Sequence, residues 1–463
     1  MTRRRLTLLP LAAAALALAA VVPGLWPAAA AADVAGRIQS ILHKKHLDRR
    51  GTAVFVWDLH TGRQVYSQYP TTPLVPASNL KLVTAAAALQ VWGKDYRIAT
   101  QLLTDGEMSP AGTLDGDLYL RGLGDPSLST LRYQRRELHM RTASVEGFVR
   151  RLKAKGVRRV TGAVVADDSW FDRRRVCAAW RPGLQDECGR ITALSVDEGL
   201  RDGNRLRTPA LYAAERLTKA LRRAGVKVAH KPRLGETPAG ALLLARQWSA
   251  PLDRLIRRLN KDSDNYFAEV LLKGLGRELA DEGTTDAGLQ ALRDALARVG
   301  ADPASYRLAD GSGLSYQNRV TAGDLTRLLV AAYRRDDWPA YRDSLALAGR
   351  DGTLEDRMER TAAAGNARAK TGSLDIAASL SGYVTSADDH LLVFSIISNA
   401  SDLAYWDTIK VHDAVVTALA SGRLGGEPRV RATPSTRQQV TGAVAAGFVT
   451  GRALVPGVEV AGP

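Results

Sequence analysis

The sequence contains little cysteine and little histidine, and these shortages exclude much of metal chemistry. Only two cysteines and seven histidines occur in 463 residues. The histidines show no spacing typical of metal ligands, and two thiols without a nearby histidine do not make a zinc site. We therefore expect the protein to hold no metal and no other cofactor.

Long apolar runs are also scarce. Only the stretch from Leu6 to Val22 approaches the roughly 18 residues that a membrane span needs. The basic residues Arg3–Arg5 precede it, and the small residues Ala30–Ala32 follow it before Asp33. This order is typical of an export signal, so residues 1–32 are predicted to be a cleaved signal peptide, with an uncleaved membrane anchor as the alternative. The mature protein is expected outside the cytoplasm, associated with the cell wall or secreted.

In that compartment thiols usually pair. Cys177 and Cys188 lie close together in the sequence, and the spacing predicts a structural disulfide between them.

Acidic residues are outnumbered by basic ones, and the formal net charge is +16. Removal of residues 1–32, which hold three arginines and no acidic residue, leaves +13. An exported protein rarely meets nucleic acid, so the positive charge favours anionic cell-wall polymers as partners. A general compositional bias toward arginine is the alternative, because the charge is spread along the chain.

Strand and helix signals flank a long middle region. The pattern predicts strands at 52–58 and 64–67, a helix from Pro76, strands at 367–373, 377–385 and 390–397, and a last helix at 404–420. These elements suggest one sheet with helices on its faces. The resulting division is a signal peptide at 1–32, a catalytic domain in two parts at 33–95 and 246–424, an inserted region at 96–245 with strands near 117–120, 160–166 and 241–245, and a tail at 425–463.

Ser78 and Lys81 lie three residues apart at the start of a predicted helix, so they share one face. A lysine acts as a base toward serine only when burial or a second cation lowers its pKa. Lys370 is the candidate for that second cation, and Ser78 is then the nucleophile. Taken alone, Ser78 also fits an ordinary helix N-cap.

Two further motifs complete the set. In Ser263-Asp264-Asn265, Ser263 is a candidate proton relay and Asn265 a candidate for binding a substrate amide, although the stretch also fits a helix cap. In Lys370-Thr371-Gly372-Ser373 the small glycine permits close approach of another backbone. The backbone N–H groups of Ser78 and Ser373 are candidates for an oxyanion hole, and Lys370, Thr371 and Ser373 for binding a carboxylate.

The order of the three motifs is that of penicillin-binding proteins and serine β-lactamases. Longer strings resemble the D-Ala-D-Ala carboxypeptidase/endopeptidases, the low-mass class C penicillin-binding proteins. These strings lie at 116–126, 166–171, 263–269, 310–315 and 369–372.

The resemblance implies an α/β (α+β) fold, with an antiparallel sheet flanked by helices and a large inserted region. It also implies acyl-enzyme hydrolysis of peptidoglycan stem peptides, and inhibition by β-lactam antibiotics. Ser78, Lys81, Ser263, Asn265 and Lys370 would form the catalytic site. Thr371, Gly372 and Ser373 would bind substrate.

Two residues depart from the family pattern: Ser373 replaces a threonine, and Tyr266 replaces a smaller aliphatic residue in a position that would reshape the pocket. A β-lactamase or esterase of the same fold and a non-catalytic wall-binding protein are the alternatives. The Glu-x-x-Leu-Asn loop of class A β-lactamases does not occur between Asn265 and Lys370.

Overall fold

Six antiparallel strands form the main sheet, in the order β14-β15-β16-β17-β1-β2. The computed structural model describes residues 26–399 and 403–426. Strands from the beginning and the end of the chain meet where β1 pairs with β17. The strands are β1 (Thr52–Asp58), β2 (Arg63–Gln68), β14 (Ala346–Leu347), β15 (Arg368–Leu374), β16 (Ala377–Thr385) and β17 (Leu391–Asn399).

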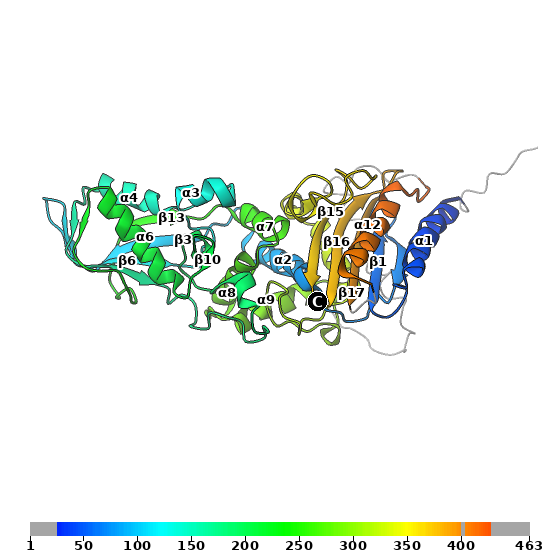
Figure 1. The fold of residues 1–463 in the computed structure, drawn as a ribbon, viewed down its shortest axis with the longest axis horizontal. Coiled ribbons are helices and arrows are strands. Elements are labelled where there is room, and N and C mark those ends of the chain that lie inside the picture. The colour runs from blue at the N-terminus through cyan, green and yellow to red at the C-terminus, as the bar shows by residue number, and fades with distance from the viewer. Residues whose placement is uncertain (1–25, 400–402, 427–463) are drawn as a thin grey trace, which may run out of the picture.

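Helices cover both faces of this sheet, which explains why β1 is buried along its whole length. On one face lie α1 (Trp26–Lys44) and α12 (Tyr405–Ser421), whose apolar residues, Ile38 and Val415 among them, pack against Val54 and Phe394 (Figure 1). On the other face lies α10 (Ala322–Tyr333), which contacts β1 and β17.

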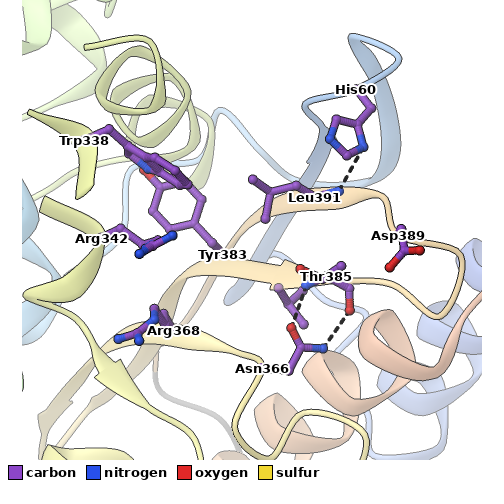
Figure 2. Close-up of a pocket in the computed structure, with 10 residues that line it drawn as sticks. His60, Trp338, Arg342, Asn366, Arg368, Tyr383, Thr385, Asp389 and Leu391 are labelled. Atoms are coloured by element: carbon purple, nitrogen blue, oxygen red, sulfur yellow. Dashed lines mark hydrogen bonds between the residues drawn. The ribbon is translucent and has the colours of Figure 1, made fainter. Parts of the chain in front are cut away.

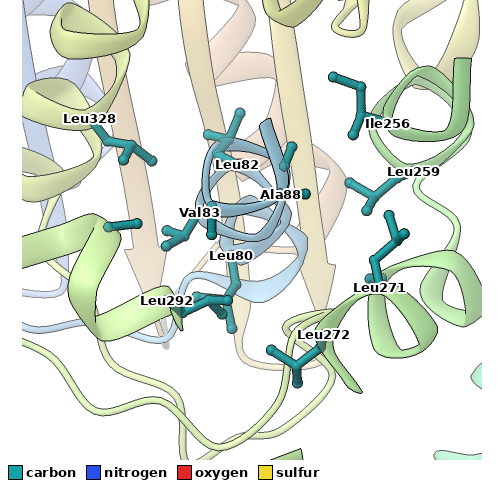
Figure 3. Packing of buried hydrophobic residues seen from close by; sticks show 14 of the residues in the cluster. Leu80, Leu82, Val83, Ala88, Ile256, Leu259, Leu271, Leu272, Leu292 and Leu328 are labelled. Atoms are coloured by element: carbon teal, nitrogen blue, oxygen red, sulfur yellow. The ribbon is translucent and has the colours of Figure 1, made fainter. Parts of the chain in front are cut away.

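Helix α2 (Leu80–Trp92) lies at the centre of the second core. Apart from Lys81, Thr84 and Gln90 its residues are apolar, which is typical of a helix buried all round. Figure 3 shows Leu80, Leu82 and Val83 of this helix surrounded by side chains of the neighbouring helices. Those neighbours are α7 (Leu252–Lys261), α8 (Asn265–Ala280), α9 (Thr285–Ala297) and α10, with α11 (Trp338–Asp343) beyond α7.

The stretch between α2 and α7 builds two larger sheets and one two-stranded sheet. One of the larger sheets has the order β12-β8-β6-β3-β13 and the other β11-β7-β5-β4. In Figure 1 this part lies at the opposite end of an elongated molecule from the main sheet. Its strands are β3 (Ala99–Thr104), β4 (Glu107–Met108), β5 (Thr113–Asp115), β6 (Leu118–Gly122), β7 (Arg159–Val160), β8 (Val164–Asp167), β11 (Lys227–Val228), β12 (Arg233–Leu234) and β13 (Leu242–Trp248).

Two amphipathic helices, α4 (Val145–Ala154) and α6 (Pro209–Arg223), contribute to the core beside these sheets. The remaining short elements are α3 (Leu131–Tyr133), α5 (Gln185–Cys188), the strand pair β9 (Leu200–Arg201) and β10 (Asn204–Arg205), and single turns at η1 (Ala77–Asn79), η2 (Gln134–Leu138), η3 (Asp197–Gly199), η4 (Pro303–Ser305) and η5 (Gly352–Leu354).

The sequence predictions for the main sheet are confirmed to within two residues at each end. One prediction in the middle region is wrong: the single strand at 160–166 is two strands, β7 and β8, in different sheets. Gly162 lies at the break, where an added Cβ would come within 2.4 Å of the Gly116 carbonyl oxygen. The neighbouring chain breaks at the same place, because β7 pairs with β5 and β8 pairs with β6 on either side of Gly116.

The predicted disulfide is also wrong. Cys177 and Cys188 are both free and buried. The Cys177 thiol donates a hydrogen bond to the Ala309 carbonyl at 3.3 Å, and Cys188 is fully buried at the end of α5. Each thiol is packed against its own neighbours, so closeness in sequence does not produce a bridge.

The predicted signal peptide lies largely outside the described residues, as does most of the predicted tail. Helix α1 starts at Trp26 and runs across the predicted cleavage position before Asp33. Within residues 26–399 and 403–426, no helix is both long and apolar enough to span a bilayer.

Candidate active site

Ser78 lies in the turn η1 directly before α2, and two glycines allow other segments to pack against this turn. An added Cβ at Gly313 would lie 1.9 Å from the Ala77 carbonyl oxygen, and one at Gly372 would lie 3.0 Å from the Ser78 nitrogen. Ala77 itself has a left-handed backbone, with φ of 46°, which is uncommon for a residue with a side chain. The turn is therefore fixed tightly between the 310–315 loop and strand β15.

Lys81 makes three hydrogen bonds at the centre of the site. Its Nζ lies 3.0 Å from Ser78 Oγ, 2.6 Å from Asn265 Oδ1 and 2.7 Å from the Ser312 carbonyl oxygen. The three partners come from the start of α2, the start of α8 and the 310–315 loop. Lys81 thus joins three segments that are far apart in the sequence.

The Lys81 side chain is fully buried. Burial lowers its pKa to about 8, against the opposing charges of Asp310, Glu269 and Asp264. A value near 8 gives Lys81 a substantial neutral fraction at physiological pH. Burial, one of the two causes expected from the sequence, is the main cause of this shift in pKa, and Lys370 is not among the causes.

In the Ser263-Asp264-Asn265 stretch, one residue caps a helix and another contacts Lys81. Asp264 is the N-cap of α8, and its carboxylate accepts a hydrogen bond from the Phe267 nitrogen at 3.0 Å. Asn265 contacts Lys81 through Oδ1, while its Nδ2 donates to the Glu187 carbonyl oxygen at 3.0 Å. Ser263 has a left-handed backbone, with φ of 57°, a conformation that clusters at functional sites.

The third motif lies on β15. Lys370 is fully buried, and its Nζ donates to the Thr371 carbonyl oxygen at 2.8 Å. Burial lowers the pKa of Lys370 well below its usual value, and the charge of Lys81 adds to this shift. The charge of Lys81 thus acts on Lys370, whereas burial dominates the pKa of Lys81.

The two hydroxyl groups of this motif already have protein partners. Thr371 Oγ1 donates to Thr353 Oγ1 at 2.8 Å, and the Tyr405 hydroxyl donates to Ser373 Oγ. Ser373 is exposed at the end of the strand, so its hydroxyl lies at the surface of the site.

Glu269 and Ser312 were not singled out as site residues by the sequence analysis. Glu269 Oε1 accepts hydrogen bonds from the backbone nitrogens of Gly311 and Ser312, at 3.0 and 2.7 Å. These bonds orient the Ser312 carbonyl that Lys81 contacts. The string at 310–315 was the available signal, but only the fold brings it against α2.

Asp310 holds the other half of the same loop. Its carboxylate accepts hydrogen bonds from the nitrogens of Gly313 and Ser315 and from Trp180 Nε1, at 2.8, 2.6 and 2.8 Å. Burial and the charge of Asp310 raise the pKa of Glu269 to about 7. Two buried acids thus hold the loop beside the lysine.

Tyr266 follows the second motif and is almost fully buried in the core. Its ring packs in the same core cluster as the apolar residues of α8, and its effect on the shape of the pocket stays a prediction.

Two other features lie away from the motifs. Figure 2 shows a cavity of about 680 Å³ lined by residues such as Trp338, Arg342 and Arg368, and no residue of the three motifs lines it. Asp58, His60 and His390 form a group whose ligand atoms could hold a metal ion. However, the Asp58 carboxylate already accepts hydrogen bonds from His390, from Thr61 and from the backbone nitrogen of His60. These bonds are typical of a structural link between two turns.

A six-stranded antiparallel sheet between helices, with a serine and a buried lysine at the start of the central helix, defines the class. The protein has the fold of penicillin-binding proteins and serine β-lactamases. Solved structures agree: penicillin-binding protein 4 (dacB) from Haemophilus influenzae has a TM-score of 0.68 at 21% identity, over 89% of this chain and 99% of that chain. A second structure of that protein, in complex with a β-lactam, has a TM-score of 0.63 at 21% identity, over 82% of this chain and 98% of that chain.

The sequence comparisons give the family. The D-Ala-D-Ala carboxypeptidase 3 (S13) family matches residues 34–202 and 196–420. The D-alanyl-D-alanine carboxypeptidase of Actinomadura sp. (strain R39) is 33% identical over 81% of this chain and 83% of its own. Carboxypeptidase DacB of Mycolicibacterium smegmatis is 33% identical over 74% of this chain and 75% of its own. The chain belongs to the S13 family, and the resemblance inferred from its motifs is confirmed.

Proposed function

We propose that Ser78 is the nucleophile of this serine-type D-Ala-D-Ala carboxypeptidase, and that the enzyme releases the terminal D-Ala of peptidoglycan stem peptides through an acyl-enzyme. Membership of the S13 family gives the reaction class. The observation that carries the residue assignment is the 3.0 Å contact between Lys81 Nζ and Ser78 Oγ inside a buried site.

Lys81 acts as the general base in acylation. A neutral amine has two N–H bonds and one lone pair, which match its three contacts. The N–H bonds point to Asn265 Oδ1 and the Ser312 carbonyl oxygen, so the lone pair is left for the proton of the Ser78 hydroxyl. As that proton moves to Lys81, Ser78 Oγ attacks the carbonyl carbon of the scissile D-Ala-D-Ala bond.

The attack converts the carbonyl oxygen into an oxyanion. We assign its stabilisation to the backbone N–H groups of Ser78 and Ser373, which lie on the two segments that Gly372 allows to approach each other. The C–N bond then breaks, and the departing D-Ala amine takes a proton that originates on Lys81 and passes through the Ser263 hydroxyl. Water, activated in turn by neutral Lys81, hydrolyses the ester and regenerates Ser78.

Lys370 binds the free carboxylate of the substrate. Burial and the charge of Lys81 disfavour the ammonium form of Lys370 in the empty site, and an incoming carboxylate supplies the missing counter-charge. A hydrogen bond between charged groups contributes about 1.5–3 kcal/mol. Ser373, at the exposed end of the same strand, and Tyr405, at the start of α12, add hydroxyl groups to this subsite.

The location follows from the substrate. Stem peptides lie outside the cytoplasm, and the basic and apolar stretch of residues 1–32 supports export. The positive charge of the mature chain favours retention near anionic wall polymers. β-Lactams are expected to acylate Ser78, since they present a strained amide and a carboxylate to the same groups.

Labelling with a fluorescent penicillin tests the assignment. Wild-type protein should carry one drug molecule per chain by intact-mass spectrometry, and Ser78→Ala should carry none. Release of D-Ala from a soluble pentapeptide should stop in the same variant. Labelling that persists in Ser78→Ala would show that another residue is the nucleophile.

A further inference from the structure

A second cavity, of about 380 Å³, lies between the far ends of α2 and α8 and the edge strand β13. Ser78 and Asn265 lie at the N-terminal ends of the two helices, whereas Trp92 and Arg277 lie near the C-terminal ends. Helix α2 has 13 residues, so its rise of 1.5 Å per residue separates the two ends by about 20 Å. The cavity is therefore distinct from the acyl-transfer site.

Aromatic side chains concentrate in this cavity. Three of the eight tryptophans of the chain, Trp92, Trp170 and Trp248, line it together with Tyr96. Trp92 and Tyr96 stack on each other, with ring centroids 5.1 Å apart. Trp248 is 48% exposed and Tyr96 37%. An aromatic ring that remains half exposed beside a cavity is a feature of binding surfaces.

Arginines alternate with these rings. Arg246 lies over Trp248 at 5.5 Å and Arg277 over Trp170 at 4.1 Å. Arg97 also lines the cavity, while Glu278 is its one acidic residue. Arg277 is also paired with Asp281 at 3.1 Å, so Arg97 and Arg246 are the arginines that give the cavity its positive charge. Guanidinium groups are suited to carboxylates.

Flat aromatic faces and guanidinium groups together match a sugar chain that carries carboxylates. The apolar faces of pyranose rings pack on aromatic rings, and the carboxylates pair with arginine. We propose that this cavity binds a peptide-free stretch of the glycan strand of the wall polymer, whose amino sugars bear free lactyl carboxylates where no stem peptide is attached. This choice of polymer rests on the proposed function. The enzyme would hold such a stretch at one end of α2 while it cleaves a stem peptide carried elsewhere on the polymer at the other.

Isothermal titration of the full-length protein with peptide-free glycan strands, prepared with an amidase, tests this proposal. Trp248→Ala should weaken binding by about tenfold, because it removes the most exposed ring. Leu242→Ala is the matched control: it removes an apolar side chain that is 62% exposed on the same strand, and binding should not change. Both variants should still acylate with penicillin and release D-Ala from a soluble pentapeptide at the wild-type rate.

Two other probes separate the contributions of sugar and charge. Chitotetraose has the rings without the carboxylates, and polyglutamate has the carboxylates without the rings. We expect the glycan strand to bind more tightly than either, and Arg246→Ala to reduce its advantage over chitotetraose. Equal binding of glycan strands by wild type and Trp248→Ala, or polyglutamate binding as tight as that of the glycan, would overturn the proposal.

The test of glycan binding does not depend on the assignment of Ser78 as the nucleophile. Ser78→Ala should bind glycan strands as the wild type does, although it releases no D-Ala. If Ser78→Ala remained active, the nucleophile assignment would fail, and the glycan measurements would still decide the role of the cavity.

Discussion

Helices α2 and α8 have very different surroundings at their two ends. At the N-terminal ends Lys81 is fully buried, and its Nζ is bonded to Ser78, Asn265 and the 310–315 loop. At the C-terminal ends Trp248 is half exposed and arginines lie over aromatic rings beside an open cavity. The same two helices thus position a buried candidate reaction centre and a partly exposed surface.

The difference explains what each end is suited to do. A reaction centre needs a lysine whose pKa is lowered, and burial achieves this at the N-terminal end. A surface for a long polymer needs accessible rings and positively charged side chains. Changes at the N-terminal ends should therefore affect chemistry, and changes at the C-terminal ends should affect polymer binding alone.

The largest effect is expected for Lys81→Ala. Loss of the general base should slow penicillin acylation by about a hundredfold or more. Lys273→Ala is the matched control, because Lys273 is equally buried on α8 but pairs with Asp172. Stopped-flow fluorescence of labelling measures both variants. Near-normal acylation by Lys81→Ala at neutral pH would show that a different group takes the proton.

The second largest loss of activity is expected for Lys370→Ala. Loss of the cation should reduce kcat/KM for the free-acid peptide by about tenfold or more. A peptide with an amidated C-terminus should be a comparably poor substrate for the wild type, and Lys370→Ala should no longer distinguish the two peptides. Chromatographic assay of released D-Ala gives both ratios. If the wild type hydrolysed both peptides equally, the carboxylate would not be the recognised group.

Glu269→Gln should have a smaller and more specific effect. Glutamine keeps an oxygen acceptor for the nitrogens of Gly311 and Ser312 but removes the charge that raises the pKa of Lys81. Asp310, Asp264, Cys188 and Lys370 remain as the other titratable groups near Lys81. Since a lower pKa leaves the amine neutral in more acidic solution, the acid limb of the acylation profile should move to lower pH.

Glu269→Ala provides the comparison for that variant. It removes the acceptor as well, so the loop loses its support and the maximal rate should fall at every pH. If the acid limb of the acylation profile lay at the same pH in Glu269→Gln and in the wild type, Glu269 would have only a structural role.

The smallest effect concerns the cysteines. Because both thiols are free, titration of unfolded, unreduced protein should find two thiols, and Cys177→Ser should acylate within about twofold of the wild type. In the native state both should react slowly, since burial raises the pKa of both thiols, that of Cys177 to about 12. A titration that found none would restore the disulfide.

Local patterns in the sequence predicted the main sheet well, because strand alternation and turn residues act over a few positions. β1 and β16 have the predicted bounds, and the fold class is confirmed by the structural neighbours. The family and reaction class are likewise confirmed. The roles of the site residues and the division into domains remain predictions.

Local sequence patterns could not predict features that depend on contacts between residues far apart in the sequence. Nothing near Glu269 in the sequence indicates that it supports the carbonyl of Ser312, and nothing near Tyr405 indicates its bond to Ser373. The strand at 160–166 looked continuous because nothing within it shows that its pairing partner changes from β5 to β6. The disulfide was predicted from the short spacing of the two cysteines, and spacing does not show what each thiol packs against.

The pH dependence of acylation tests the central claim, that buried Lys81 acts as a neutral base, most directly. The second-order rate of labelling by a fluorescent penicillin should be measured on the wild type across the neutral and alkaline range. Since the pKa of Lys81 lies at about 8, the rate should fall about tenfold for each pH unit below that value. A rate that stays constant from about pH 9 down to about pH 6 would contradict the account.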